Sequence, residues 1–214
     1  SLRLHWLFKK LARPESEFMY RQLVRASNVY MNIELAGQQI DVDYLEDLEF
    51  ELDNLVNAAN KKLDAVASRI WDPELYKAET GAKSATDKFS VGSPKQLKWM
   101  LQRVLGYPVP STDATLIQNL LLDVEAGRIT NPDAKEFLES VGDVRKYSKY
   151  LETYALGIRR VLCRDGRVRC TFNLHGTETG RLSSSGPNMQ NIPRNKMIKN
   201  LIIATPGYKL LQLD

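Results

Sequence analysis

Residues 177–193 form a segment that is too polar for a protein core and too rich in turn formers for a long helix or strand. Gly180, Gly186, Pro187 and Pro193 favour a non-repeating backbone. A long loop inside a compact protein is usually functional. Its remaining side chains are mostly hydrogen-bonding groups, and Arg, Gln and Asn together suit the phosphates and base edges of nucleic acids. We call residues 177–193 the polar segment.

The polar segment resembles the signature of family A DNA polymerases, the DNA polymerase I type. Thr179–Pro193 reads T-G-R-L-S-S-S-G-P-N-M-Q-N-I-P, where the family carries T-G-R-L-S-S-x-x-P-N-L-Q-N-I-P. Met189 in place of Leu is the one conspicuous change, and it conserves volume. The resemblance runs from about Asn28 to Asp214 and is densest from Gly166 onward.

Shorter matches lie before the polar segment. Residues 32–41 are similar to the family pattern I-E-x-x-G-x-x-I-D, and residues 93–97 contain its S-x-x-Q-L. Residues 152–154 resemble its S-T-Y, with Glu152 in place of Ser. Lys199 and Ile202 depart from the Arg and Phe that the family more often has, and the linker after Pro193 is short.

The resemblance implies a set of DNA-binding residues. The minor groove offers acceptors at nearly the same place in every base pair, so donors there test the shape of a pair without reading its identity. Arg181 would reach this groove at the primer end, Gln190 and Asn191 would lie near the template–primer junction, and Asn188 would help to hold the loop. The alternative is a polar loop held together by its own side chains.

The remaining DNA-binding candidates are Thr179, in the signature, and the pair Arg145 and Lys149. Arg145 and Lys149 are four residues apart and share one helix face, for which a solvated face is the alternative.

Asp214 is the catalytic and metal-binding candidate that the resemblance implies. In the family, a strand like residues 208–213 ends in an Asp that binds two Mg²⁺ ions, which activate the primer 3′-hydroxyl and stabilise charge on the phosphate of the incoming dNTP. Carboxylate and phosphate oxygens are the ligands that Mg²⁺ prefers. One carboxylate cannot hold two metal ions, so we expect this chain alone to be inactive. Its partners would be primer–template DNA, dNTP and the C-terminal fingers and palm portion, on the same or a separate chain.

The hydrophobic pattern predicts an α+β, mainly helical fold, with a helical thumb of long antiparallel helices and the first strands of an incomplete palm. The expected domains are residues 1–40 as the end of an exonuclease-like region, 41–165 as the thumb and 166–214 as the start of the palm. Apolar spacing and capping residues predict helices over residues 1–12, 15–37, 43–66 with an Asp43–Glu46 capping box, 93–106, 111–124 and 131–161. Residues 70–88 are expected to be a loop, 194–199 a basic linker, and residues 168–174, 201–204 and 208–213 strands, with a turn at Asp165-Gly166.

Composition narrows the class of protein. The net charge is +4, but the part from Val141 onward has 13 Lys or Arg against 5 Asp or Glu, which favours a polyanionic partner for that part. The chain has no apolar run of membrane-spanning length and no secretion signal, so we expect no membrane association and an intracellular location. Cys163 and Cys170 are expected to be reduced thiols rather than metal ligands, and His175 is expected to be a structural histidine.

The sequence therefore predicts part of a DNA-directed DNA polymerase, either truncated or one half of a split enzyme, that grips the duplex and supplies one catalytic Asp. The main alternative is a non-catalytic DNA-binding module derived from a polymerase thumb. A relative of single-subunit RNA polymerases is a weaker alternative, because the T-G-R-L-S-S stretch at residues 179–184 argues against it.

Overall fold

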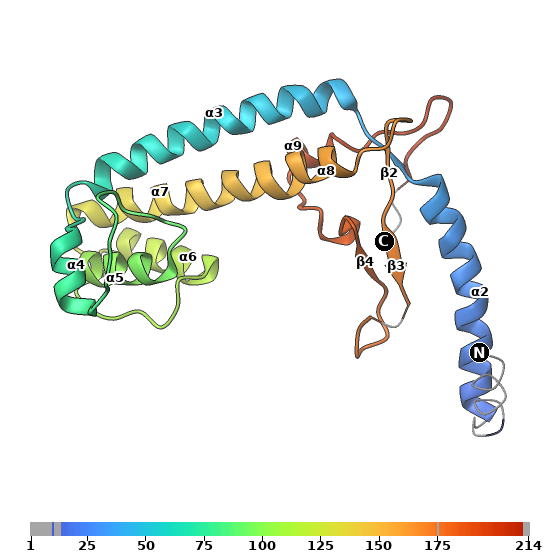
Figure 1. Ribbon diagram of the computed structural model, residues 1–214, viewed down its shortest axis with the longest axis horizontal. Coiled ribbons are helices and arrows are strands. Elements are labelled where there is room, and N and C mark those ends of the chain that lie inside the picture. Colours follow the sequence, from blue (N-terminus) through green and yellow to red (C-terminus); the bar gives the residue numbers. More distant parts are fainter. Residues whose placement is uncertain (1–9, 11–13, 175, 212–214) are drawn as a thin grey trace. The chain divides into compact units, whose positions relative to one another are not determined.

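The computed structural model describes residue 10, residues 14–174 and residues 176–211, and it is mainly helical with small antiparallel sheets (Figure 1). This confirms the predicted fold class. The chain divides into two compact units. We call residues 49–152 the helical unit and residues 1–48 with 153–214 the mixed unit. The helix expected over residues 1–12 lies almost wholly outside the described residues.

The helical unit contains most of α3 (Val42–Ala67), followed by α4 (Pro73–Thr80), α5 (Pro94–Leu105), α6 (Ala114–Glu125) and α7 (Pro132–Lys149). Helix α5 matches its prediction at both ends. The Ser93 hydroxyl accepts from the Gln96 N–H, Pro94 opens the first turn, and Gly106 ends the helix at φ 80°. At α7 the Asn131 side chain accepts from the Asp133 N–H, as its sequence indicated.

The loop expected over residues 70–88 is wrong in part, because Pro73–Thr80 is helical. The Asp72 carboxylate accepts from the Glu74 and Leu75 N–H groups, and Gly81 closes the helix at φ 67°. Tertiary packing also favours α4, because the Tyr76 ring is buried. Its centroid lies 5.1 Å from that of Trp71 and 5.6 Å from that of Trp99.

Two other helix starts differ from the prediction. Asp41, not Asp43, caps α3, because its carboxylate accepts from the Tyr44 N–H at 3.0 Å. Glu46, the expected partner in a capping box, instead forms an ion pair with Arg159 at 3.4 Å. Helix α6 begins at Ala114 rather than near residue 111, with the Asp113 carboxylate accepting from the Leu116 N–H.

One apolar cluster joins the helices of the helical unit. It draws side chains from α3, α4, α5, α6 and α7, and its fully buried members include Leu97, Met100, Leu101, Phe137 and Leu138. Helices α4, α5 and α6 gather near the start of α7 (Figure 1). Burial of this many apolar side chains is the dominant stabilising contribution in such a unit.

The predicted helix over 131–161 is confirmed, but its middle is not α-helical. Helix α7 continues into a π-helical segment, η1 (Tyr150–Ala155), and then into α8 (Leu156–Val161). The predicted apolar spacing from Val144 to Val161 fits an uninterrupted α-helix equally well, so the pattern could not indicate the wider turn. π-Helical turns occur often at functional sites.

The mixed unit begins with α2 (Pro14–Ala36), whose predicted stop at Gly37 is confirmed at φ 64°. Strand β1 (Gln38–Gln39) pairs antiparallel with β2 (Arg167–Val168). Strand β3 (Thr171–Asn173) pairs antiparallel with β4 (Ser183–Ser185). A 3₁₀ turn, η2 (Met189–Asn191), and one helical turn, α9 (Lys196–Lys199), follow.

Several strand predictions are therefore wrong in detail. The strand expected over 168–174 is divided between two different sheets, with residues 169–170 as the break. Residues 201–204 contribute one bridge, Ile40–Ile202, rather than a strand. Residues 208–211 form no strand, and residues 212–214 lie outside the described part. The expected linker 194–199 includes α9, because the Asn195 side chain accepts from the Met197 N–H. The Asp165-Gly166 turn is confirmed by a Gly166 N–H to Cys163 carbonyl bond of 3.0 Å.

Among the described residues, we find no helix that combines the length and the apolar character required to span a bilayer.

Candidate functional site

The β3–β4 hairpin determines the path of the polar segment. Thr171, Phe172 and Asn173 lie opposite Ser185, Ser184 and Ser183, in that order. The expectation of a non-repeating backbone is wrong at this point, because the serine triplet pairs as β4. Three serines in a row give no alternation of apolar and polar residues, so only the partner strand identifies them as a strand.

Ser184 holds the inner side of the polar segment. The Ser184 residue is only 5% exposed, and its hydroxyl donates to Asn188 Oδ1 at 3.0 Å. The Gln190 N–H donates to both the Ser184 hydroxyl and Asn188 Oδ1, at 3.3 and 3.1 Å. Asn188 is thus the cap of η2. This agrees with its expected part in holding the loop, and the buried hydroxyl is fully paired.

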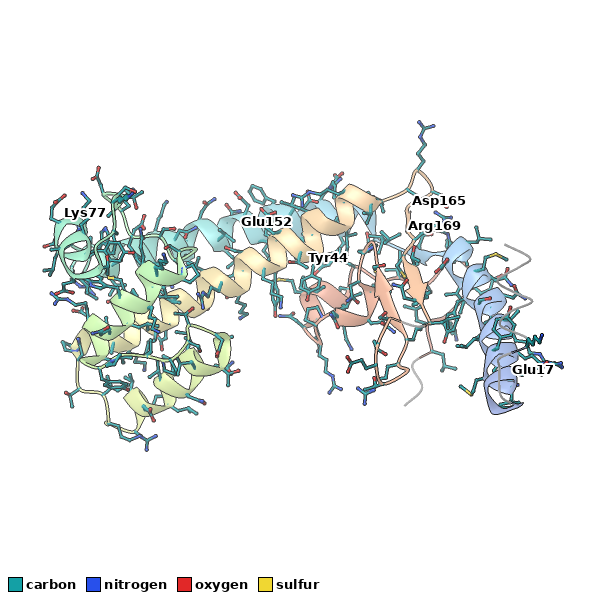
Figure 2. All side chains as sticks on the ribbon, turned by 60° about the horizontal axis from the view of Figure 1, so that its bottom comes forward. Glu17, Tyr44, Lys77, Glu152, Asp165 and Arg169 are labelled. Carbon is teal, nitrogen blue, oxygen red and sulfur yellow. The ribbon has the colours of Figure 1, made fainter. Side chains whose placement is uncertain are left out.

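Two tyrosines on different helices hold the chain at and after the polar segment. The Tyr154 hydroxyl, from η1, donates to the Asn191 carbonyl at 2.9 Å. The Tyr44 hydroxyl, from the first turn of α3, donates to the Met197 carbonyl at 3.0 Å (Figure 2). The segment is therefore attached to helices as well as to its own hairpin.

The outer side of the segment carries its exposed donors. Thr179, Arg181, Gln190 and Asn191 are all exposed. Within the described residues the Arg181 guanidinium forms no ion pair or hydrogen bond, whereas its carbonyl accepts from the Thr177 hydroxyl at 2.7 Å. The local backbone is thus tied down while the charged end of the side chain reaches solvent. This arrangement leaves the Arg181 donors available to a ligand.

Other arginines of the basic C-terminal part are used within the protein. Arg169 donates from both terminal nitrogens to the Asp165 carboxylate, at 3.1 and 2.6 Å, and from Nε to the Leu35 carbonyl (Figure 2). This bidentate pair lowers the pKa of Asp165 from 3.8 to about 2. Arg167 donates to the carbonyls of Ala36 and Gly37 and to the Thr205 hydroxyl. The positive charge counted in the sequence is therefore not all available to a polyanion.

Arg145 and Lys149 lie in the helical unit and differ in environment. Arg145 is half-buried, and one terminal nitrogen donates to the Thr112 carbonyl. Burial lowers the pKa of its guanidinium, and the nearby Asp113 carboxylate partly opposes that shift. Lys149 is exposed in the last turn of α7. Of the two, Lys149 presents the more accessible charge.

The expected metal ligand, Asp214, lies outside the described residues, as does His175. Among the residues that are described, no cluster of three or more His, Cys, Asp or Glu side chains is arranged to hold a metal ion. Cys163 and Cys170 are free and half-buried. Burial raises the pKa of the Cys170 thiol, to which the Glu34 carboxylate also contributes, so its thiol form is favoured.

Comparison with known proteins decides the family. The model of DNA polymerase family A matches residues 61–214, which is most of the chain. This chain belongs to DNA polymerase family A. The match includes all of the polar segment and both Arg145 and Lys149.

Individual DNA polymerases resemble the chain along nearly its whole length. A DNA polymerase of Escherichia phage T5 is 30% identical over 228 aligned residues, which cover 100% of this chain and 24% of the phage protein. DNA polymerase I of Caldicellulosiruptor bescii is 29% identical over 211 residues, covering 92% of this chain and 21% of that protein. The chain thus spans about a quarter of the length of the curated relatives that it matches.

A solved structure of a POL domain has a similar fold. The structure described as the POL domain of Pol1 from M. smegmatis, in complex with DNA primer–template and dNTP, aligns with a TM-score of 0.65 and 28% identity. The alignment covers 94% of this chain and 33% of that one.

Sequence reasoning missed Ser184 and Tyr154 as supports of this family A segment. In the sequence, Tyr154 belongs only to the S-T-Y match at residues 152–154. Ser184 stood among three serines with nothing to distinguish it. Tyr154 donates to a residue 37 positions away, and Ser184 donates to Asn188, four positions away but across an irregular turn, so both hydrogen bonds appear only in the folded chain.

Proposed function

We propose that this chain forms the thumb and the first part of the palm of a DNA-directed DNA polymerase, and that it grips the primer–template duplex. The observation that carries the proposal is the polar segment. Its inner groups are paired with one another, while Arg181, Gln190 and Asn191 remain exposed. A rigid backbone that presents solvent-facing donors is what shape-dependent contact with a minor groove requires.

In this proposal, two of the three parts expected from the sequence contact the duplex. Residues 41–165 would act as the thumb, with Lys149 and Arg145 along the duplex backbone. Residues 166–214 would begin the palm and bring the polar segment to the primer end. Because Arg145 already donates to the Thr112 carbonyl, Lys149 would contribute more of the salt-dependent binding.

For catalysis, Asp214 would supply one carboxylate ligand for Mg²⁺. When bound, the two ions of a polymerase site activate the primer hydroxyl and neutralise charge on the reacting phosphate. The described residues add no cluster of metal ligands. The remaining carboxylate would therefore come from the fingers and palm portion of the polymerase, and the chain by itself would not extend a primer.

Exposed apolar side chains support a protein interface between this chain and the fingers and palm portion. Helix α2 exposes large apolar residues on several sides, and Tyr208, Leu210 and Leu211 are exposed as well, Leu211 by 81%. Exposed apolar surface of this extent indicates a protein interface. We propose that the fingers and palm portion, on the same or a separate chain, covers part of it.

A reconstitution experiment tests the proposal. The 214-residue chain is mixed with a fingers and palm portion, and Mg²⁺-dependent primer extension is measured against each part alone. We expect extension only in the mixture, abolished by Asp214→Ala and reduced about 10–100-fold by Arg181→Ala, as for loss of a charged contact to the reacting end. Arg164→Ala is the matched control, because Arg164 is exposed beside the Asp165-Gly166 turn and no hydrogen bond or ion pair of its side chain occurs among the described residues.

Three outcomes would contradict parts of the proposal. Extension by the chain alone would refute its expected inactivity. Tight duplex binding without extension in the mixture, unaffected by Asp214→Ala, would favour the non-catalytic DNA-binding module instead. If Arg181→Ala and Arg164→Ala behaved alike, the polar segment would not be the duplex contact.

A further inference from the structure

We propose that Tyr154 is a positioning residue that sets how Gln190 and Asn191 are presented to the duplex. The inference rests on the proposed function, since it concerns the same polar segment. It adds a residue that lies 37 positions before Asn191 in the sequence and that carries no exposed donor of its own.

The Tyr154 side chain is firmly held. The residue is only 8% exposed, and its neighbours Ala155 and Ile158 are buried too. It lies in the π-helical segment η1, between α7 and α8. A packed ring with one polar end can hold a distant group in place at low cost in conformational entropy.

The Tyr154 hydroxyl acts on one end of a short turn. Asn191 is the last residue of η2, and its carbonyl accepts the tyrosine hydroxyl at 2.9 Å. The other end of η2 is held by Asn188 and Ser184, which both accept from the Gln190 N–H. The turn is therefore fixed at both ends by different elements, one from the helix and one from the hairpin.

The side chains between these two supports are the exposed ones. Gln190 and Asn191 both reach solvent, although their backbone groups are used internally. Because a 3₁₀ turn of three residues has little intrinsic stability, its orientation depends on such anchors. Loss of the hydroxyl would free one end of the turn, and the two amide side chains would then sample more orientations.

Tyr44 provides a matched control within the same unit. Its hydroxyl also donates to a backbone carbonyl, that of Met197, at 3.0 Å. Met197 lies in α9, beyond the polar segment. Tyr44→Phe thus removes the same kind of bond without touching the turn that carries Gln190 and Asn191.

The test measures binding of the 214-residue chain to a fluorescent primer–template duplex by anisotropy. We expect Tyr154→Phe to weaken binding about 3–10-fold, because the variant loses the one hydrogen bond that holds this end of the turn in its binding orientation. Tyr44→Phe should change it less than about twofold. Far-UV circular dichroism and thermal unfolding should be nearly the same for both variants, because each phenylalanine keeps the packing of the ring.

A double-mutant cycle separates positioning from general loss of structure. In the background of Gln190→Ala with Asn191→Ala, Tyr154→Phe should have no further effect on binding. An undiminished effect there, or no effect in the wild-type background, would overturn the inference. If the Gln190 and Asn191 substitutions themselves left binding unchanged, the proposed duplex contact would fail, and the role of Tyr154 with it.

Discussion

The two units of this chain are stabilised in different ways. The helical unit closes a single apolar core drawn from five helices, and its helices begin and end at capping residues close by in sequence. The mixed unit has very short strands, and two of them, β1 and β2, pair across a long stretch of sequence, Gln38 with Val168. Its α2 leaves large apolar side chains exposed, and two of its arginines, Arg167 and Arg169, are engaged with carbonyls and a carboxylate.

The difference shows which part of the chain relies on local signals and which on distant partners. Local caps and apolar spacing suffice for a helix that packs into a core. The polar segment has no apolar spacing and one local cap, Asn188 on η2, so its conformation depends mainly on Tyr154, on the β3–β4 pairing and on its own hydrogen bonds. A functional segment held by hydrogen bonds can expose its side-chain donors to solvent, whereas a segment held by core packing must bury the side chains that hold it.

The largest expected effect comes from replacing a buried phenylalanine of the helical unit by alanine. The same substitution at an exposed phenylalanine of the mixed unit is the comparison. Phe137 is fully buried, whereas Phe18 on α2 is 61% exposed. Phe137→Ala should lower the free energy of unfolding by about 3–5 kcal/mol, because it leaves a cavity. Phe18→Ala should change it by about 0.5 kcal/mol or less, as for an exposed site. Urea unfolding followed by circular dichroism measures both.

Equal losses for the two phenylalanine variants would break the comparison. Such a result would mean that α2 is covered in solution, for instance by a second copy of the chain. Sedimentation of wild-type chain at the same concentration distinguishes that case.

Glycine-to-alanine substitutions after α5 and after α2 should have intermediate effects on the free energy of unfolding. Gly106, after α5, has φ 80° with open space where a Cβ would lie, so Gly106→Ala should cost about 1–2 kcal/mol from backbone strain alone. Gly37, after α2, has φ 64°, and a Cβ there would lie 2.8 Å from the Arg169 Cγ and 3.0 Å from the Val168 carbonyl oxygen. Gly37→Ala should therefore cost about 2–4 kcal/mol, strain and crowding together.

Thermal unfolding of the two alanine variants and the wild-type chain provides the comparison. If Gly106→Ala destabilised the chain as much as Gly37→Ala, the crowding of Gly37 against Val168 and Arg169 would add nothing to the backbone strain.

The smallest expected effect is on how stability changes with pH in the acid range. The bidentate Arg169 pair lowers the pKa of Asp165 to about 2, below its ordinary 3.8. A lowered folded-state pKa stabilises the native state above pH about 4, and that contribution is lost as the pH falls from about 4 towards 2. Asp165→Asn should remove this part of the pH dependence and leave a shallower fall in unfolding midpoint over the same range.

Asp87→Asn in the helical unit is the control for the acid experiment, since Asp87 is exposed and no hydrogen bond or ion pair of its side chain occurs among the described residues. Its acid profile should follow the wild type. Identical profiles for all three proteins would show that the Asp165–Arg169 pair is too solvent-screened to matter.

Much of the helical unit was predictable. Ser93-Pro94 and Gly106 bound α5 as expected, and the long apolar series in α3 is confirmed. The missed helix α4 also had a local signal, because Asp72-Pro73 and Gly81 are a start and a stop. The prediction failed there because the residues between have no clear period, and the burial of Tyr76 against Trp71 and Trp99 is a tertiary effect.

The mixed unit was less predictable. The alternation through residues 168–174 indicated one strand, but a strand needs a partner, and two different partners divide it. Nothing in a triplet of serines indicated β4. For the site, the exposed Arg181, Gln190 and Asn191 were nominated from residue type and resemblance, whereas their supports, Ser184 and Tyr154, were not.

The amino-acid sequence by itself determined the family, the positions of most helices and the chemical character of the polar segment. These properties reside in residues close together along the chain, such as caps, turn formers and apolar spacing. Only the tertiary structure decided which arginines are occupied, where the strands pair and which groups brace the turn that carries Gln190 and Asn191. The Tyr154–Asn191 bond and the pairing of β1 with β2 join residues far apart in sequence. Closer pairs, such as Asp165 with Arg169 and Ser184 with Asn188, depend on an irregular backbone path, which likewise exists only once the chain has folded.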